Sequence, residues 1–370
     1  MKDCFLVYNK LKIRTYDKFA YSEVILKQED FLTREKSFPF SEKEHNFNDL
    51  KNADEHPFLT SWYLWSEENY ILRFNNCTLE PEHGWGLSGA NSLLYWSLPF
   101  SKTAHQKKPT LIPYWLRKNV EKLDIAISFR DTGEENYFHF FNDILTKPVF
   151  LKQHSISVAE IPIVISGKLW HKPYFQYCLK NATLLQDLKW IIQDKQYIYC
   201  TEVIFCKVPT VNKQLLQEVF SGLRISAHRT RRIFLIRDKK RLRFLENLEE
   251  VEKVCRKFDI EVVDTDDFTF PEQIRIFSEA SLIVGIHGAG LTNMMFRKGD
   301  CKVFELFPPP EQRYLPFHYA MMAKINSFEY RAMIGTKSLS RYSGGFRVDA
   351  TKFADNLGSF MGYMAKSKQD

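Results

Sequence analysis

The sequence has no apolar run near the roughly 18–20 residues that a membrane-spanning helix needs, and it has no CxxC pair. Its seven cysteines are an odd number without regular spacing, which argues against a paired disulfide framework and favours free thiols. Residues 1–12 alternate polar and apolar side chains and lack the apolar core of a signal peptide. Together these features predict a protein of the reducing cytoplasm.

Repeats and low-complexity segments are absent as well, and acidic residues are mixed with the basic ones almost everywhere. The net charge of +7 is modest for 370 residues, so we expect no nucleic-acid partner. The charge suits an anionic ligand, and it also allows peripheral association with the inner face of a membrane. Arg229–Arg243 is the exception, because eight of these fifteen residues are Arg or Lys.

The chain is 44% hydrophobic, and from Leu123 onward its apolar residues alternate between strand-like and helix-like spacing. In the first half, a strand at Leu123–Phe129 precedes a helix at Tyr137–Leu151, which Pro148 is expected to kink or end early. In the second half, strands at Arg232–Ile236 and Leu282–Ile286 flank a helix at 248–258. This alternation predicts parallel sheets with crossover helices, and hence an α/β fold.

The strongest chemical signal is an apolar strand that runs into a glycine-rich turn, Ile283–Asn293. Glycine lets the backbone bend and lets a ligand approach closely, and the N–H groups at the start of a following helix favour a phosphate. His287 could donate a hydrogen bond to a phosphate oxygen, and Asn293 could orient the turn or contact the ligand. A tight turn with a satisfied histidine is the alternative. The remaining candidate residues of this turn are Gly288, Ala289 and Gly290.

Three further residues belong with this turn, because ligands of α/β sheets bind outside the carboxyl ends of the strands. Arg237 ends a predicted strand on the same rim as His287, and Arg243 follows it shortly after. Their guanidinium groups could clamp a diphosphate, although a solvated basic surface is the alternative. Glu305 ends another strand on this rim, where it could accept hydrogen bonds from a ribose or sugar hydroxyl, or simply face solvent.

A separate candidate pair lies in the first half, where His139 and Asp143 stand four residues apart near the start of a predicted helix. This spacing puts both side chains on one helix face, and a histidine beside a carboxylate can act as a general base toward a hydroxyl. A capping and packing pair is the alternative. The spacing is also compatible with a metal, but no third ligand is evident, so no metal is expected.

Taken in this order, the segments resemble glycosyltransferase family 61 from about Leu123 to Tyr330, while residues 1–120 add nothing to the resemblance. Known members are plant xylosyl- and arabinosyltransferases, animal N-acetylglucosaminyltransferases, and bacterial proteins associated with capsule or exopolysaccharide synthesis. The matching segments are Asn136–Asp143, Leu235–Arg237 with Arg243 and Asn247, Phe270–Ala280, the signature Ile286–Asn293, and Val303–Leu306.

The resemblance implies a GT-B type fold, in which two Rossmann-like domains face each other and bind the acceptor and the nucleotide. We then expect residues 1–120 to be a less regular N-terminal extension of the acceptor-side domain, which itself occupies residues 121–210. The nucleotide-sugar-binding domain is expected at residues 211–345. Residues 346–370 are expected to form a C-terminal helix that packs back on the first half.

The resemblance also implies an inverting transfer, with His139 or Asp143 as the base. Arg237, Arg243 and the turn at His287–Gly290 would hold the diphosphate of the donor, most simply a UDP-sugar, and Glu305 would hold the sugar or ribose. No metal or other cofactor is required by this scheme. The implied partners are the donor and a glycan or lipid-linked glycan acceptor in bacterial capsule, exopolysaccharide or lipopolysaccharide synthesis.

Three other functions fit parts of the same pattern. A polysaccharide pyruvyltransferase also has two α/β halves with a basic cleft, but it uses phosphoenolpyruvate. A non-catalytic nucleotide-binding or scaffolding subunit of a polysaccharide assembly is the second alternative. A nicotinamide-dependent oxidoreductase is disfavoured, because His287 stands where the dinucleotide pattern would place a glycine.

Overall fold

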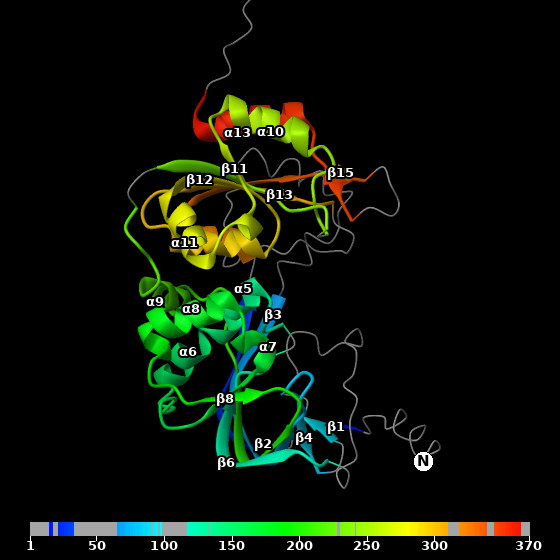
Figure 1. The fold of residues 1–370 in the computed structure, drawn as a ribbon, viewed down its shortest axis with the longest axis vertical. Helices are drawn as coiled ribbons and strands as arrows, with labels where there is room; N and C mark the ends of the chain where they lie inside the picture. The colour runs from blue at the N-terminus through cyan, green and yellow to red at the C-terminus, as the bar shows by residue number, and fades with distance from the viewer. Residues whose placement is uncertain are drawn as a thin grey trace, which may run out of the picture. The chain divides into compact units, whose positions relative to one another are not determined.

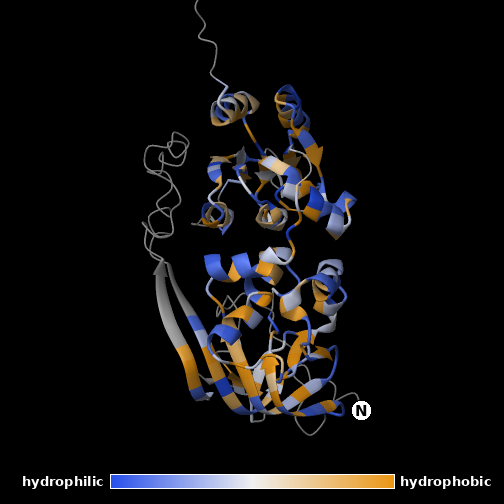
Figure 2. Ribbon diagram, turned by 90° about the vertical axis from the view of Figure 1, so that its left-hand side faces the viewer, coloured by the Kyte–Doolittle hydropathy of each residue, from blue (hydrophilic) through white to orange (hydrophobic). Residues whose placement is uncertain are grey.

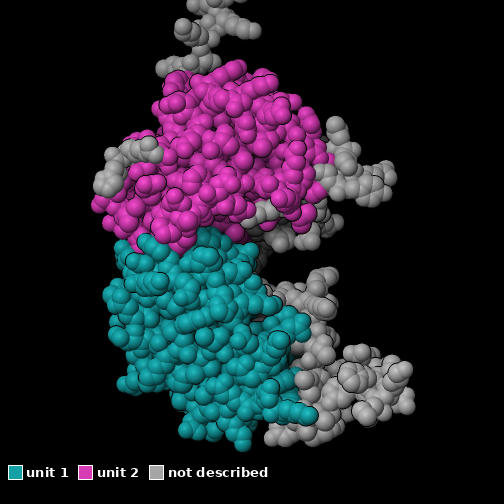
Figure 3. Space-filling view, in the orientation of Figure 1, with its two compact units in different colours: residues 1–30, 67–222 teal, residues 31–66, 223–370 magenta. Residues whose placement is uncertain are grey.

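The computed structural model describes residues 15–17, 21–32, 65–89, 92–94, 97, 117–131, 133–227, 230–240, 242–309, 318–338 and 344–363. The chain divides into two compact units, one of residues 1–30 and 67–222 and the other of residues 31–66 and 223–370 (Figure 3). Much of the extension expected at residues 1–120 lies outside the described residues. The break between the units follows Gly222, twelve residues later than the break expected after residue 210.

In its described residues, the first unit is built on a mixed nine-stranded sheet with the order β1-β5-β4-β3-β9-β6-β7-β8, and β2 pairs with β3. Strands β9, β6, β7 and β8 are parallel, whereas β3 runs antiparallel to β9. Figure 2 shows hydrophobic residues along the strands of this sheet, interspersed with polar ones. The strands are β1 (Thr15–Asp17), β2 (Tyr21–Leu32), β3 (Trp65–Leu79), β4 (Gly86–Ser88), β5 (Ser92–Leu94), β6 (Val120–Ser128), β7 (Ile163–Ser166), β8 (Trp190–Gln193) and β9 (Tyr197–Lys207).

The helix expected at Tyr137–Leu151 is present but divided. A single turn α5 (Tyr137–His139) passes into a π-helical turn η4 (Phe140–Ile144), and α6 (Lys147–Gln153) follows. Pro148 lies in the first turn of α6, where its missing N–H is not needed, so it does not end the helix. The other helices of the unit are α7 (Gly167–Trp170), α8 (Pro173–Asn181), the 3₁₀ turn η5 (Thr183–Leu185) and α9 (Lys213–Ser221).

Aromatic packing fixes the π-helical turn against the neighbouring helices. Phe141 stacks on Phe220 of α9, with ring centroids 4.9 Å apart. Phe140 contacts Phe175 of α8 at 5.7 Å, and Phe175 in turn contacts Trp190 of β8 at 5.4 Å. Because all four phenylalanines are completely buried, the backbone of η4 is held from two sides.

The second unit contains a five-stranded parallel sheet in the order β11-β10-β12-β13-β14. The first strand in sequence, β10, therefore has later strands on both sides, and the direction of winding reverses between β10 and β12. At such a reversal, the crossover helices go to opposite faces and leave a crevice at the carboxyl ends of the two strands. The strands are β10 (Arg231–Leu235), β11 (Glu261–Val263), β12 (Ala280–Ile286), β13 (Lys302–Phe307) and β14 (Glu329–Ile334).

Helices cover both faces of this sheet: α10 and α13 lie on one side, and α11 lies on the other (Figure 1). The helical segments are α10 (Leu248–Lys257), η6 (Thr265–Asp267), α11 (Phe270–Glu279), η7 (Ala289–Phe296), α12 (His318–Ile325) and α13 (Ala350–Met361). A short hairpin of β15 (Thr336–Lys337) and β16 (Phe346–Arg347) precedes α13. The expected α/β class is therefore confirmed, with a parallel sheet in the second unit and a mixed sheet in the first.

The C-terminal helix is present, but its expected packing on the first half is wrong. Helix α13 packs beside α10, and its side chains Phe353, Leu357 and Phe360 belong to the hydrophobic core of the second unit. Phe353 contacts Phe304 of β13 at 5.6 Å. The spacing of apolar residues defines the buried face of a helix, but it does not identify the surface that the face covers.

Among the described residues, no helix has the length and apolar character that a membrane span requires. No group of three or more His, Cys, Asp or Glu side chains in this part of the chain could hold a metal ion.

Candidate functional site

His287 directly follows β12 and lies at the point where the winding of the second sheet reverses. Its N–H donates to the carbonyl of Leu306 at 2.9 Å, which extends the ladder between β12 and β13 by one residue. The ring is buried and stacks on Phe307, with centroids 4.9 Å apart and planes at 21°. The backbone and the ring are therefore both fixed by β13 and the residue that ends it.

The orientation of the His287 ring is set by a buried carboxylate. Nδ1 of His287 lies 2.5 Å from Oε1 of Glu305, whose side chain is completely buried. With Nδ1 donating to this carboxylate, Nε2 accepts a hydrogen bond when the ring is neutral and donates one when the ring is charged. Nε2 is therefore the ring nitrogen through which His287 would contact a ligand.

Glu305 has a second partner, which the sequence analysis missed. The hydroxyl of Tyr330 on β14 donates to Oε2 of Glu305. Burial raises the pKa of Tyr330 well above its usual value, and the charge and hydrogen bond of Glu305 raise it further, so the hydroxyl stays protonated and donates. Both oxygens of Glu305 are thus engaged inside the protein. The expected contact between Glu305 and a sugar or ribose hydroxyl does not fit this burial, and Glu305 instead positions His287.

We expect Tyr330→Phe to destabilise the second unit by about 1–3 kcal/mol, because it leaves one oxygen of a buried carboxylate without its donor. Denaturant unfolding of the variant measures this loss. Tyr363→Phe is the matched control, since Tyr363 is 52% exposed, and its unfolding midpoint should not change. Equal stability of both variants would show that Glu305 does not depend on the hydroxyl of Tyr330.

Arg237 approaches the glycine-rich turn from the neighbouring strand. It follows β10, and its Nη1 donates to the carbonyl of His287 at 3.3 Å. A Cβ atom at Gly288 would lie only 1.7 Å from this Nη1, so the guanidinium occupies the space above the glycine. A side chain at position 288 would therefore have to displace the Arg237 guanidinium.

Arg243 adds a second positive charge to this region. Its backbone has a φ of 65°, and its N–H donates to the carbonyl of Gly344 at 2.6 Å. Burial and then the charge of Glu305 raise the pKa of Tyr319, whereas the charges of Arg243 and Arg237 lower it. Both guanidinium groups are therefore near enough to Tyr319 to affect its pKa. The ring of Tyr319 contacts the ring of His287, with centroids 5.2 Å apart.

The turn after His287 leads into a 3₁₀ helix, η7, with Gly288 as its N-terminal cap. The N–H of Leu291 donates to the carbonyl of Gly288 at 3.0 Å. Because a 3₁₀ helix bonds each N–H to the carbonyl three residues earlier, the N–H groups of Ala289 and Gly290 come before the first bond of η7. Ala289 and Gly290 are partly exposed. These two amides are available to a phosphate group.

Asn293 holds the turn in place. Its side chain is buried, and its Nδ2 donates to Oε1 of Gln273 on α11 at 3.3 Å. Of the two roles that the sequence left open, this geometry favours orientation of the turn. Asn247, another residue of the matched pattern, pairs with both backbone groups of Val348 at 2.8 and 3.1 Å, and so anchors the segment that leads into α13.

We expect Gly288→Ala to weaken the binding of a nucleoside diphosphate about 10-fold or more, because the new methyl group displaces the Arg237 guanidinium and its charge-assisted hydrogen bonds. Isothermal titration calorimetry measures the change. Gly358→Ala on α13 is the control, because a Cβ there meets its neighbours at ordinary distances of 3.4 and 3.6 Å. Unchanged affinity in Gly288→Ala would place the ligand away from Arg237.

In the first unit, the structure brings His139 and Asp143 together. Asn136 caps α5 by accepting from the N–H groups of Phe138 and His139 at 3.0 and 3.4 Å. Nδ1 of His139 lies 2.6 Å from Oδ2 of Asp143. The side chain of His139 is 29% exposed, whereas that of Asp143 is only 7% exposed. His139 is therefore the member of the pair that solvent or a ligand can reach.

The pKa of His139 is raised above its usual value. Burial alone would lower it, but the hydrogen bond and charge of Asp143 and the charge of Asp131 raise it by more. Asp131 was not among the residues predicted from the sequence. Burial raises its pKa, Lys147 lowers it, and Asp143 raises it further. Its position shortly after the buried strand β6 was an available signal, because carboxyl ends of strands carry functional side chains.

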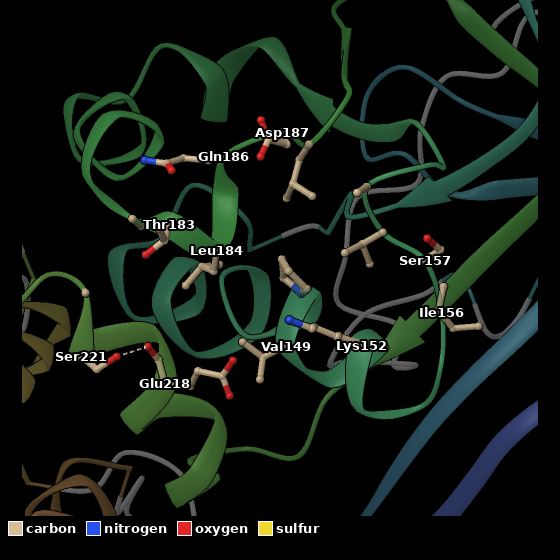
Figure 4. A pocket seen from close by; sticks show the side chains of 16 residues that line it. Val149, Lys152, Ile156, Ser157, Thr183, Leu184, Gln186, Asp187, Glu218 and Ser221 are labelled. Atoms are coloured by element: carbon tan, nitrogen blue, oxygen red, sulfur yellow. Dashed lines mark hydrogen bonds between the residues drawn. The ribbon is translucent and has the colours of Figure 1, made fainter.

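A separate pocket of about 490 Å³ lies elsewhere in the first unit, between α6, η5 and α9 (Figure 4). Its walls combine aliphatic side chains such as Val149, Ile156 and Leu184 with the charged groups of Lys152 and Glu218. None of the candidate residues described above lines this pocket.

Much of the region that holds these residues is similar to known proteins. Residues 137–304 match the family model described as Glycosyltransferase 61. A beta-1,2-xylosyltransferase of Oryza sativa subsp. japonica is 39% identical over 62 residues, which are 17% of this chain and 11% of that protein. An EGF domain-specific O-linked N-acetylglucosamine transferase of Gallus gallus is 31% identical over 80 residues, which are 21% of this chain and 14% of that protein.

The aligned regions thus span less than a sixth of the length of these curated relatives. One solved structure, a dodecameric iron-containing heptosyltransferase in complex with ADP-D-beta-D-heptose, aligns with a TM-score of 0.33 and 11% identity. The alignment covers 74% of this chain and 81% of that one.

Proposed function

Residues 137–304 place this chain in glycosyltransferase family 61, and from this premise we propose that it transfers a sugar from a nucleotide-sugar donor to a hydroxyl group of a glycan acceptor. The observation that carries the proposal is the group of residues at the winding reversal of the second sheet. Arg237 lies over Gly288 there, beside His287 and the start of η7. Positive side chains and unbonded amides at such a crevice suit a diphosphate.

The donor site accounts for the departure of the leaving group. As the bond between the anomeric carbon and the phosphate oxygen breaks, its electron pair goes to the diphosphate. Arg237, Arg243 and the amides of Ala289 and Gly290 stabilise the added negative charge. A metal ion is not needed in this scheme, because fixed cationic side chains supply the charge.

The pair in the first unit supplies the base. His139 takes the proton of the acceptor hydroxyl as the oxygen forms its bond to the anomeric carbon, and Asp143 stabilises the imidazolium that results. We choose His139 over Asp143 because its side chain is the more exposed of the two. One displacement at the anomeric carbon inverts its configuration.

We further propose a UDP-sugar as the donor and a polysaccharide or lipid-linked glycan as the acceptor, in polysaccharide biosynthesis in the cytoplasm. The cytoplasmic assignment is supported by the free, buried thiols of the described residues. Burial raises the pKa of Cys200 and Cys255 to about 12, so these two thiols remain protonated and unreactive.

Release of nucleoside diphosphate from a panel of nucleotide sugars, with and without polysaccharide acceptors, tests the proposal. We expect release from one nucleotide class, stimulated by an acceptor, and loss of this activity in His139→Gln. Consumption of phosphoenolpyruvate without any use of nucleotide sugars would identify a pyruvyltransferase instead. Nucleotide binding without turnover of any donor would favour a scaffolding subunit.

A further inference from the structure

Asn142 occupies the position next to Asp143 and is itself only 1% exposed. Its Nδ2 donates to Oδ1 of Asp143 at 2.6 Å, and its Oδ1 accepts from the N–H of Val211 at 2.7 Å. A backbone N–H can only donate, so the amide oxygen must face Val211 and the NH₂ group must face the carboxylate. The orientation of the Asn142 side chain is thereby fixed at both ends.

Val211 is an unusual anchor for this bond. It has a φ of 49°, which lies in the left-handed region that a β-branched residue rarely adopts. It is buried between β9 and α9, directly before Asn212, whose side chain caps α9 by accepting from the N–H of Leu215 at 3.1 Å. Strained conformations of this kind persist only where the surroundings impose them, and they gather at functional sites.

The π-helical turn η4 carries both Asn142 and Asp143. The N–H of Leu145 donates to the carbonyl of Phe140 at 2.9 Å, and the hydroxyl of Thr146 donates to the carbonyl of Asn142. The stacking of Phe141 on Phe220 holds this turn against α9. A π-helical turn inserts one residue into a helix and is found often at functional sites. Here it lets two successive side chains, Asn142 and Asp143, both point into the protein.

We propose that Asn142 is a positioning residue, which holds one oxygen of Asp143 so that the other faces Nδ1 of His139, with the Val211 turn as its anchor. The link to sugar transfer rests on the proposed function. The link between Asn142 and the titration of His139 does not, because it concerns only the folded chain.

Several charged groups near His139 affect its pKa, and each of them matters for the expected effect of an Asn142 variant. Asp143 lies on η4 itself, and Asp131 comes from the loop after β6. The charge of Lys147 on α6 lowers the pKa of Asp131. Gly133 is uncharged, and a Cβ there would lie 3.1 Å from the His139 ring. Asn142→Ala adds and removes no charge, so a change in the titration of His139 in that variant must come through Asp143.

The test is an NMR titration of the protein with ¹³C-labelled histidine rings, in which His139 is assigned by its loss in His139→Gln. We expect Asn142→Ala to lower the titration midpoint of His139 by about one pH unit, because Asp143 is no longer held toward the ring. We expect Asn142→Asp to raise it by a similar amount, because a second carboxylate then lies beside the first. His171, an exposed residue in the same spectra, is the internal control.

The lowered midpoint in Asn142→Ala separates positioning from a purely structural role, which would lower the stability of this variant and leave its His139 midpoint unchanged. A His139 midpoint within about 0.2 units of wild type in both folded variants would overturn the inference. If Asn142→Ala fails to fold, Asn142→Ser takes its place, because it is also uncharged and is too short to bridge Asp143 and Val211. Where transfer is measurable, Asn142→Ala should lower kcat about 10-fold with the donor KM unchanged. Absence of transfer in the wild type would contradict the proposed function alone.

Discussion

Replacing Arg237 with alanine is expected to weaken nucleoside diphosphate binding about 100-fold, the largest effect of any single change in the second unit. The guanidinium lies directly over Gly288 and contacts the carbonyl of His287, so it is a positive group in direct contact with the glycine-rich turn. Its removal deletes both a charge and a bidentate donor. Isothermal titration calorimetry of the wild type and the variant measures the change.

Arg256→Ala is the matched control for this experiment. Arg256 lies on α10 in the same unit, and its 61% exposed side chain pairs with Glu252 at 3.5 Å. Its loss lowers the net charge by the same amount, so equal weakening in both variants would point to a general charge effect. His287→Ala should weaken binding in the same direction as Arg237→Ala. Retention of full affinity in Arg237→Ala would remove the diphosphate from the proposed site.

Replacing His139 with glutamine is expected to lower the rate of sugar transfer about 10²–10⁴-fold, the usual contribution of a general base. Donor affinity should stay unchanged, because the proposed donor site is built from residues of the second unit. Asp143→Ala should also reduce transfer, since it removes the group that orients the ring. His171→Gln is the control, because His171 is an exposed residue at the end of α7. Full activity in both His139→Gln and Asp143→Ala would refute the choice of base.

The pH dependence follows from the direction of the His139 pKa shift. Only the neutral ring can accept a proton, so transfer should fall as the pH decreases through a pKa that lies above the usual value of about 6.5. The effect on stability has the opposite sign. Because the pKa is higher in the folded chain, the charged pair stabilises the fold below about pH 6.5, and this contribution is lost as the pH rises through the folded pKa. A pH–rate profile and thermal midpoints between pH 5 and about 9 check both expectations.

The glycine-rich turn could be predicted from the sequence because all of its determinants are local. An apolar run, a histidine and two closely spaced glycines at 288 and 290 specify a strand, its end and the turn that follows. The family resemblance rested on the same local pattern, and the match over residues 137–304 confirms it. The His139–Asp143 contact was predictable for the same reason, since the two residues share one turn.

Contacts between distant segments were missed. The role of Glu305 depends on Tyr330, which lies 25 residues further along the chain and meets it only because β13 and β14 pair in register. The expected packing of helix α13 on the first half was wrong, because the spacing of its apolar residues does not identify the surface that they cover. The role of Asn142 could not be predicted from the sequence, because its second hydrogen-bond partner, Val211, lies 69 residues away. Asp131 differs from these, since it lies shortly after a buried strand and could have been noted.

The most direct test of the account is a thermal-shift screen of the wild-type protein against UDP, GDP, CMP, NAD and phosphoenolpyruvate. A ligand at 100 times its dissociation constant adds about 2.7 kcal/mol to the free energy of unfolding, which raises the midpoint measurably. The account predicts stabilisation by a nucleoside diphosphate, UDP first, and loss of this stabilisation in Arg237→Ala. Stabilisation by phosphoenolpyruvate or NAD alone, or by none of the five, would contradict it.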